Sequence, residues 1–388
     1  MDSRRLKLIG LAYYKIRYFL HWLFVRKDIR NAYSYVWATL FSRDAGLALL
    51  DPLYRIFPSL APYPKQIEME VTTACNLKCI ICEHTYWRER PQSLTYEDFL
   101  KIMAQFPSLH WIGMTGIGSS FLNKDYLRML EYLKRDKRTF VEFFDSFYMF
   151  DEEKARTCVE LGIDKIWISM ESAHREVYNK IRVGSDFDTV VKNIENLIRI
   201  KKELRSPLPE LWFHFIINKY NEGELLDYVD LVEHFARLEG TKSRPILYFT
   251  NMLAFNETAD LVANVTKDTV RKVEEYCRKK RLFYVFNENV VCDSPMKECV
   301  KWNEPFILVS GHIQPCCAIN EANVRQYQTD HAFMNVLQGD FRNFWRSAEM
   351  KQFIRTMRGG GINDICKYCH IYKHPDKLRC KPNSTPKQ

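Results

Sequence analysis

An alternation of strand-like and helix-like segments from Lys65 to Phe249 constrains the fold more than any other feature of this sequence. Six short runs have the composition of buried strands: Gln66–Val71, Trp111–Met114, Phe140–Phe144, Lys165–Met170, Leu211–Ile217 and Pro245–Phe249. Between them, apolar residues recur at helical spacing in Thr95–Gln105, Asp125–Lys134, Glu152–Leu161, Phe187–Glu203 and Glu222–Arg237. Such alternation favours a parallel sheet covered by helices. We therefore predict an α/β fold, a partial (β/α)6 barrel of the TIM type, with its site at the carboxyl ends of the strands.

Three closely spaced cysteines follow directly after the first predicted strand. Cys75, Cys79 and Cys82 stand in a C-x3-C-x2-C loop. A structural [4Fe–4S] cluster takes four cysteines, so three leave one iron without a protein ligand. An open coordination position is what separates a catalytic metal site from a closed structural one. That iron could chelate the amino and carboxylate groups of a small molecule such as S-adenosylmethionine (SAM). The alternative is a zinc site with His84 as fourth ligand.

The cysteine loop and the strand before it resemble the cluster loop of the radical SAM superfamily. The resemblance implies that these three cysteines bind a [4Fe–4S] cluster, which receives its electron from a reduced flavodoxin- or ferredoxin-type donor. It also implies that SAM is cleaved to a 5′-deoxyadenosyl radical, which abstracts hydrogen from a substrate. The cofactor then carries the hard chemistry, and the protein supplies binding and orientation.

The same resemblance places the SAM contacts at the ends of the second, fourth and fifth strands. The residues it assigns are Gly116, Gly118, Ser119, Ser169, Glu171, Arg182 and Asn218. The family's Gly-Glu-Pro turn reads Gly118-Ser119-Ser120 here, a departure that a mostly backbone contact can accommodate. Arg182 is a planar donor suited to a carboxylate, here that of the methionine moiety. The alternatives are a surface arginine at Arg182 and a turn role for Asn218.

The end of the third strand supplies the candidate catalytic residues. Relatives often carry Thr-Asn-Gly there, whereas this chain has Asp145 followed by Tyr148. We expect both side chains to point into the cavity of the barrel and to contact the substrate.

A second set of cysteines lies in the last hundred residues and resembles the SPASM/twitch extension of the superfamily. The likeness includes a short hairpin that turns at Gly311, and a Phe-x-x-x-Trp-like helix with Phe341 and Trp345. It implies one auxiliary [4Fe–4S] cluster, held by Cys299, Cys316, Cys366 and Cys369, with Cys317 and Cys292 as substitutes. Only Cys380 follows, so a second auxiliary cluster is not expected. Four thiolates leave no open iron, and electron transfer is the expected role; zinc is the alternative.

Residues Met1 to Phe57 hold ten Lys or Arg against four Asp or Glu and are rich in Tyr, Trp and Phe. Their longest uncharged run, Asn31–Ser42, is too short to span a bilayer, and no signal peptide is indicated. A basic, aromatic helix can lie in a membrane interface. The alternative is a helical pair packed on the catalytic domain or on a second subunit. Nucleic acid is not an expected partner, because the aromatic residues follow helical apolar spacing.

The chain has 388 residues and twelve cysteines, which are grouped at short spacings. This grouping favours metal ligation in a reducing compartment over a secreted disulfide scaffold. The predicted domains are a helical segment at 1–62, the partial barrel at 63–290 and the cysteine-rich domain at 291–388. The predicted location is the cytoplasm, with peripheral contact at the inner face of the membrane.

Together these features predict a radical SAM oxidoreductase or modifying enzyme. The basic aromatic start favours a lipid or lipid-linked substrate. Three alternatives stay open: dehydrogenation of a soluble sugar or aminocyclitol, maturation of a peptide, and a non-catalytic iron–sulfur or zinc scaffold.

Overall fold

The computed structural model describes most of the chain, and the residues fall into two compact units. The described residues are 13–40, 53–54, 56–240, 244–252, 257–287, 303–317, 325–358, 363 and 366. The first unit comprises Met1–Tyr33, Asn76–Thr85 and Val141–Val291. The second unit comprises Ser34–Cys75, Tyr86–Phe140 and Cys292–Gln388. The cysteine loop therefore begins in the second unit and continues in the first.

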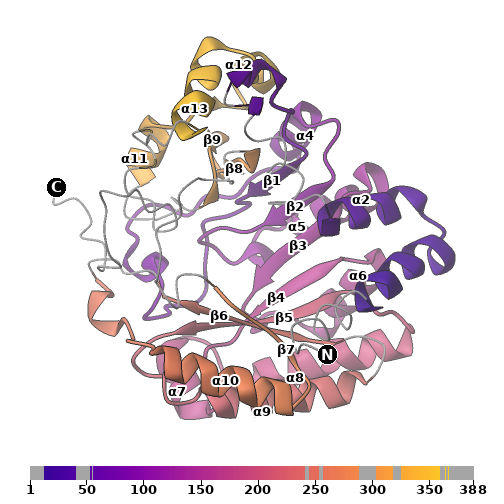
Figure 1. Ribbon diagram of the computed structural model, residues 1–388, viewed down its shortest axis with the longest axis vertical. Helices are drawn as coiled ribbons and strands as arrows, with labels where there is room; N and C mark the ends of the chain where they lie inside the picture. The colour runs from indigo at the N-terminus through magenta and orange to yellow at the C-terminus, as the bar shows by residue number, and fades with distance from the viewer. Residues whose placement is uncertain are drawn as a thin grey trace. The chain divides into compact units, whose positions relative to one another are not determined.

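The first unit is a parallel sheet with helices on its outer face. Its strands lie in chain order: β3 (Phe140–Asp145), β4 (Lys165–Ser169), β5 (Glu210–Ile217), β6 (Ile246–Asn251) and β7 (Phe283–Phe286). Its helices are α6 (Glu152–Leu161), α7 (Arg175–Ile181), α8 (Phe187–Glu203), α9 (Leu225–Glu239) and α10 (Lys267–Lys279). Figure 1 shows α8, α9 and α10 lying along one face of these strands. This is the α/β arrangement that the sequence predicts.

The two faces of this sheet differ in how deeply their side chains are buried. In β5, Leu211, Phe213 and Phe215 are fully buried, whereas Trp212 and His214 between them are half-buried. Successive residues of a strand point to opposite faces. The helices therefore cover one face, and the other, which we call the inner face, carries large side chains that are only partly covered.

The second unit combines a parallel pair of strands with an antiparallel extension. Its strand order is β10 (Met334–Asn335), β9 (His312–Gln314), β8 (Phe306–Ile307), β1 (Gln66–Met69) and β2 (Trp111–Met114). Strand β1 pairs in parallel with both β2 and β8. The pairs β8–β9 and β9–β10 are antiparallel, and the β8–β9 turn contains Gly311 with a φ of 84°. The predicted hairpin is thus confirmed.

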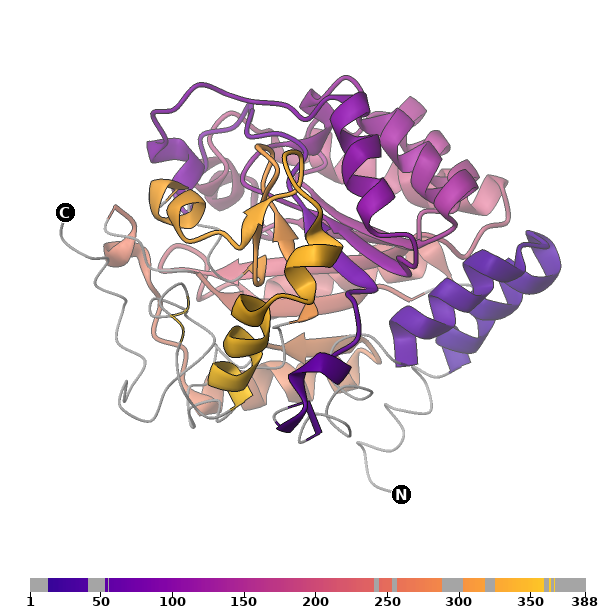
Figure 2. The same cartoon turned by 90° about the horizontal axis from the view of Figure 1, so that it is seen from above.

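Helices of the second unit flank these strands. The α-helices are α4 (Tyr96–Gln105), α5 (Tyr126–Tyr132), α11 (Arg325–Asp330), α12 (Phe341–Trp345) and α13 (Ala348–Arg358). Shorter turns are the 3-10 turns η2 (Pro58–Leu60), η3 (Glu83–Tyr86) and η4 (Ser120–Leu122), and the π-helical turn η5 (Leu133–Lys137). The first residues of η3 belong to the first unit. Asp340 caps α12 by accepting the backbone N–H groups of Arg342 and Asn343. Figure 2 shows η2 beside α12 and α13.

The N-terminal segment is helical over residues 13–20, then η1 (His21–Val25) and α2 (Ile29–Leu40). One side of it is bonded to the first unit: Trp22 Nε1 donates to Asp164 at 3.0 Å, and Lys15 pairs with Glu210 at 2.6 Å. Its other side exposes large apolar residues, namely Tyr13, Ile16, Leu20, Phe24, Val25, Ile29 and Tyr33. Among the described helices, none combines the length and hydropathy that a bilayer crossing needs.

The predicted strands and helices between Lys65 and Phe249 are found within a few residues of their predicted bounds. The parallel strand β7, which pairs with β6, was not among them, and neither was the parallel pairing of β8 with β1. The short helix α7 was also missed. The domain boundaries at 62 and 290 stay predictions.

Candidate functional site

The part of the cysteine loop in the first unit is held by backbone hydrogen bonds to the end of α7. The N–H of Lys78 donates to the carbonyl of Val183 at 2.8 Å, and that of Ile80 to Ile181 at 3.0 Å. The loop also bonds to itself, because Cys82 N–H donates to the Cys79 carbonyl at 3.1 Å. The backbone that carries Cys79 and Cys82 is therefore held in place by main-chain hydrogen bonds. Cys79 is buried, and Cys75 and Cys82 are half-buried.

Arg182 connects this loop to the end of β4. Its Nε and Nη2 both donate to the carboxylate of Glu171, which is fully buried. Its remaining Nη1 lies 3.8 Å from Cys79 Sγ. Burial alone would lower the pKa of Arg182, but the charges of Glu171 and Cys79 raise it above its ordinary value. The guanidinium is thus a permanent positive charge beside Cys79, one of the predicted cluster ligands.

This ion pair bears on the predicted roles of both Glu171 and Arg182. Glu171 and Arg182 were each expected to contact SAM, and the structure bonds them to one another instead. Glu171 is held further, since its backbone carbonyl accepts the side-chain amide of Asn221 at 2.7 Å. A direct contact of either residue with SAM stays a prediction.

The other predicted contacts of the first unit lie at the ends of β4 and β5. Ser169 is half-buried at the end of β4. Asn218 is fully buried, and its side chain closes a turn by accepting the Tyr220 N–H at 3.0 Å and donating to the Ile216 carbonyl at 3.1 Å. The turn role is therefore present at Asn218, and a contact with adenosine stays a prediction.

Asp145 lies away from the inner face. It follows Phe144, whose ring is on the inner face against Trp167, so strand alternation directs Asp145 to the helix side. Its charge acts on Cys158 of α6, and its Oδ1 accepts the Phe147 N–H at 2.6 Å. Burial raises its pKa to about 7, against the lowering effects of that N–H and of Arg182.

Tyr148, the second catalytic candidate, is half-buried in the turn after β3. Its carbonyl lies 3.4 Å from the side-chain amide of Asn193. The position of Asp145 on the helix side differs from the expected cavity position. A catalytic role for either residue stays a prediction.

The glycine loop after β2 packs closely on the segment that leads into the cysteine loop. A Cβ at Gly118 would lie 2.3 Å from the Thr72 carbonyl oxygen, and one at Gly116 would lie 2.5 Å from Cγ of Glu70. The Ser119 N–H donates to the Ala74 carbonyl at 2.7 Å. Only glycine allows this approach without a backbone shift. The glycines are therefore required for packing beside Cys75, and their contact with SAM stays a prediction.

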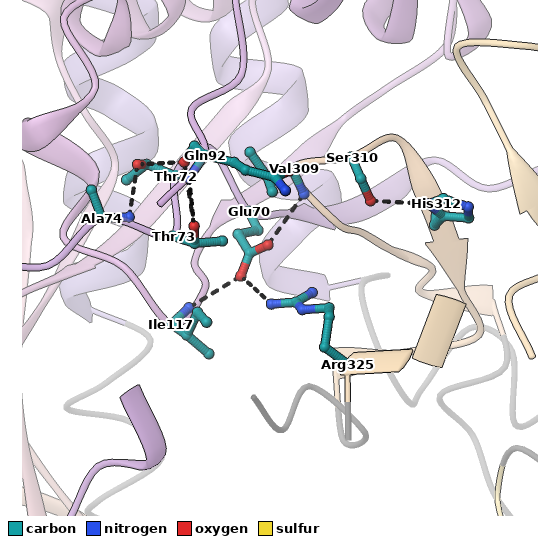
Figure 3. Close-up of polar contacts among 10 residues, drawn as sticks. All are labelled: Glu70, Thr72, Thr73, Ala74, Gln92, Ile117, Val309, Ser310, His312 and Arg325. Carbon is teal, nitrogen blue, oxygen red and sulfur yellow. Dashed lines mark hydrogen bonds and ion pairs between the residues drawn. The ribbon is translucent and has the colours of Figure 1, made fainter. Parts of the chain in front are cut away.

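A buried ion pair lies next to this glycine loop (Figure 3). It was not predicted from the sequence. The Glu70 carboxylate is fully buried and pairs with Nη2 of Arg325 at 2.9 Å. It also accepts the N–H groups of Val309 at 3.2 Å and Ile117 at 3.4 Å. Glu70 thus ties β1, the glycine loop and the segment after β8 together. Its one sequence signal is a carboxylate placed directly after a buried strand, which carries no information about a partner 255 residues away.

Three of the cysteines considered for the auxiliary cluster are described, and all three belong to the second unit. Cys316 and Cys317 are half-buried, and Cys366 is buried after α13, with its N–H donating to the Asn363 carbonyl at 2.8 Å. The predicted ligands Cys299 and Cys369, and also Cys292 and Cys380, lie outside the described residues.

Within the described residues, no three Cys, His, Asp or Glu side chains are placed to hold one metal ion. A four-iron cluster requires no such group, because each cysteine ligates a different iron. Three thiols on one short loop, beside a fixed guanidinium, are a donor set that fits such a cluster.

The inner face of the first unit carries a cluster of aromatic rings. Trp167 lies at its centre, stacked on Phe144 at 5.0 Å and packed against Trp212 at 4.6 Å and Tyr248 at 5.0 Å between ring centroids. Beside them His214 bonds to the Thr250 hydroxyl at 2.8 Å. Burial, and then the charge of Arg182, lower the pKa of His214 to about 3, so its ring is neutral near pH 7.

Comparisons with known proteins match two parts of this chain to family models. Residues 69–232 match the family model of the radical SAM superfamily, and residues 299–370 match that of the SPASM iron–sulfur cluster-binding domain.

Among curated relatives, the tungsten-containing aldehyde ferredoxin oxidoreductase cofactor-modifying protein of Pyrococcus furiosus is 26% identical over 166 residues. That match covers 42% of this chain and 46% of the relative, so it spans less than half of that protein. A probable GTP 3′,8-cyclase of Sulfurisphaera tokodaii is 21% identical over 290 residues, covering 71% of this chain and 86% of the relative.

Among solved structures, Streptococcus suis SuiB bound to S-adenosylmethionine superposes with a TM-score of 0.60 at 15% identity. The superposition covers 80% of this chain and 72% of SuiB, and it shows a shared fold. With both domain matches and the cysteine loop in place, the chain belongs to the radical SAM superfamily and carries a SPASM iron–sulfur domain, whose cofactors are SAM and [4Fe–4S] clusters.

Proposed function

We propose that this enzyme abstracts a hydrogen atom from a substrate bound on the aromatic inner face of the first unit. The observation that carries the proposal is Arg182, which Glu171 holds 3.8 Å from Cys79 Sγ at the carboxyl end of β4. Strand β4 also carries Trp167, the centre of the aromatic cluster. When bound, the cluster on Cys75, Cys79 and Cys82 together with SAM supplies the 5′-deoxyadenosyl radical.

The residues of the inner face then bind the substrate and exclude water. Trp167 is 4% exposed, and its indole Nε1 is buried without a hydrogen-bond partner among the described residues. A buried unpaired donor costs free energy unless a ligand satisfies it. His214 stays neutral and adds a polar group without adding charge. Lys165 lies over the Trp167 ring at 4.7 Å from its centroid, but its charge is paired with Glu142 at 2.5 Å. A face of this kind suits an uncharged ring or apolar group with one hydrogen-bond acceptor.

The auxiliary cluster is proposed to carry electrons away from the substrate radical, which makes the reaction an oxidation. Its proposed ligands are Cys299, Cys316, Cys366 and Cys369, with Cys317 and Cys292 as substitutes. The electron that starts each turnover is proposed to come from a reduced flavodoxin- or ferredoxin-type protein.

For the substrate we propose a lipid or lipid-linked molecule, which the enzyme takes from the cytoplasmic side of the membrane. Support comes from the apolar stripe of the N-terminal segment, in which Phe24 is 67% and Ile29 71% exposed, with the exposed cations Lys27 and Arg30 alongside. An exposed apolar stripe flanked by cations is typical of interfacial helices. If a chain lacking residues 1–58 sediments with anionic liposomes as well as the full chain does, the membrane contact is wrong.

A peptide or a nucleotide is the alternative substrate class. SuiB has been solved with its precursor peptide SuiA, and the S. tokodaii relative is a probable GTP 3′,8-cyclase. A soluble sugar or aminocyclitol would also fit an uncharged aromatic face. A non-catalytic iron–sulfur or zinc scaffold would leave SAM intact.

The test is anaerobic reconstitution, followed by iron and sulfide counting and by assay of 5′-deoxyadenosine after reduction with dithionite. About eight irons per chain and release of 5′-deoxyadenosine are expected. The variant Trp167→Phe should keep this release while weakening substrate-dependent turnover, because the indole donor is lost together with part of the aromatic surface. Bound zinc with intact SAM would overturn the enzyme reading.

A further inference from the structure

A pocket of about 590 Å³ lies in the second unit, at the amino ends of β1 and β2. Its walls come from η2, from the residues just before each of these strands, and from α12 and α13. The glycine loop and Glu70 lie at the other ends of the same strands. A four-residue strand separates the two edges by about 13 Å, so the pocket is distinct from the glycine loop and from Glu70.

Hydrogen bonds and ring contacts connect the pocket residues Tyr63 and Trp345 to one another and to α4. The Tyr63 hydroxyl donates to the Gln105 carbonyl at 2.8 Å, and the Tyr63 ring packs against Trp345 at 6.0 Å between centroids. The Gln105 side chain in turn accepts the Phe341 N–H at 2.7 Å and donates to the Gly339 carbonyl at 2.9 Å. Helices α4 and α12 are thereby joined beside the pocket.

The rim of the pocket is strongly basic. Four of the lining residues are cations: Lys65, Arg342, Arg346 and Lys351. None of the lining residues is Asp or Glu. The nearby Asp340 uses its carboxylate to cap α12. In the described part of the chain, none of the four cations forms an ion pair with a carboxylate.

We propose that this pocket binds a phosphate-bearing anion with at least two negative charges. Four unpaired cations around one cavity repel each other, and a multivalent anion removes that repulsion. Arginine matches phosphate in a bidentate geometry, and two of the four cations are arginines. The cavity has the volume of a small-molecule site, and the Ser59 and Ser108 hydroxyls line it as well.

The phosphate can come from a free phosphorylated metabolite or from a lipid headgroup, and the chemistry of recognition is the same. This proposal does not depend on the substrate proposed above, because no residue that lines the pocket belongs to the aromatic inner face.

The test is isothermal titration of the reconstituted full-length protein with pyrophosphate, at an ionic strength held constant with sodium chloride. Pyrophosphate should bind, and the double variant Arg342→Ala/Arg346→Ala should lose about tenfold or more in affinity. The control Arg355→Ala/Arg271→Ala removes two exposed arginines outside the pocket and should bind as the wild type does.

A second measurement guards against a misfolded variant. Because the pocket cations repel each other, the ligand-free double variant should melt at the same or a higher temperature than the wild type at low salt. Absence of pyrophosphate binding, or equal binding by the pocket variant, would overturn the proposal.

Vesicles separate the two sources of phosphate. If phosphatidic acid vesicles bind the protein and pyrophosphate displaces them, the ligand is a lipid headgroup. If pyrophosphate binds and these vesicles do not compete, the ligand is a free phosphorylated molecule. Phosphatidylcholine vesicles are the control.

Discussion

Nη1 of Arg182 lies 3.8 Å from Sγ of Cys79, while its Nε and Nη2 are held by the buried carboxylate of Glu171. The two residues of the ion pair are 11 positions apart, and the cysteine is 103 positions from the arginine. A fixed positive charge and an N–H donor therefore face the thiol of Cys79, a predicted ligand of the cluster. Hydrogen bonds and charge near cluster sulfurs set its reduction potential.

Arg182→Met should make the cluster harder to reduce, because the added electron loses a nearby positive charge. We expect its midpoint potential to fall by tens of millivolts in a titration followed by the electron paramagnetic resonance signal that responds to SAM. Glu171→Gln should move the potential the other way, because it removes the compensating negative charge. Arg175→Met, at an exposed arginine paired with Asp188, is the control. Equal potentials in all four proteins would contradict a tuning role.

Cys79→Ala should abolish SAM cleavage and remove about four irons per chain. Cys158→Ala is the matched control, because Cys158 is a fully buried thiol of α6 whose pKa is raised by burial. That variant should keep its iron and its 5′-deoxyadenosine release while losing some stability.

Cys366→Ala should keep SAM cleavage and lose the full reaction. Normal substrate turnover in Cys366→Ala would exclude the electron-transfer role of the auxiliary cluster.

Glu70→Gln should lower the free energy of unfolding by about 3 kcal/mol or more, since it leaves the guanidinium of Arg325 buried without its counter-charge. The double variant Glu70→Gln/Arg325→Met removes both charges and should recover much of that loss. Chemical denaturation of the wild type, the single variants Glu70→Gln and Arg325→Met, and the double variant measures the coupling. A double variant as unstable as the sum of the single variants would show that the two charges do not interact.

Asp145 should make the protein less stable as pH rises from about 4 to 7. Its pKa is raised from 3.8 to about 7 by burial, so over this range the folded state retains a proton that the unfolded state releases. The stability contributed below pH 4 is lost as pH passes through 7, by as much as about 4 kcal/mol.

Asp145→Asn retains an acceptor for the Phe147 N–H and cannot ionise, so it should be more stable than the wild type above pH 7 and similar to it near pH 4. Only the difference between the two proteins is informative, because burial lowers the pKa of His21 to about 4 and that of His214 to about 3. These histidines give a slope of opposite sign below pH 6.5 in both proteins. A difference that does not change with pH would show that Asp145 is already ionised.

The sequence by itself determined most of the elements and the cysteine spacing from which the chemistry of the cluster loop is predicted. Helix α8 was predicted at Phe187–Glu203 because its apolar spacing is a local property, and Asp186 caps it through Thr189. The cysteine spacing likewise needs no tertiary information, since three thiols within eight residues are already close together. The glycines at 116 and 118 signalled a close approach, although not what approaches them.

Only the tertiary structure decided which side chains meet. The pairs Glu171–Arg182 and Glu70–Arg325 join residues from different elements, and a carboxylate at a strand end does not encode its partner. The face of the sheet to which Asp145 points depended on the register of β3 in the sheet, since a shift of one residue moves every side chain of a strand to the opposite face. The basic pocket arose from three distant segments that the packing of Tyr63, Gln105 and Trp345 brings together. Local periodicity specifies elements, whereas the pairing of charges depends on contacts between residues far apart in the chain.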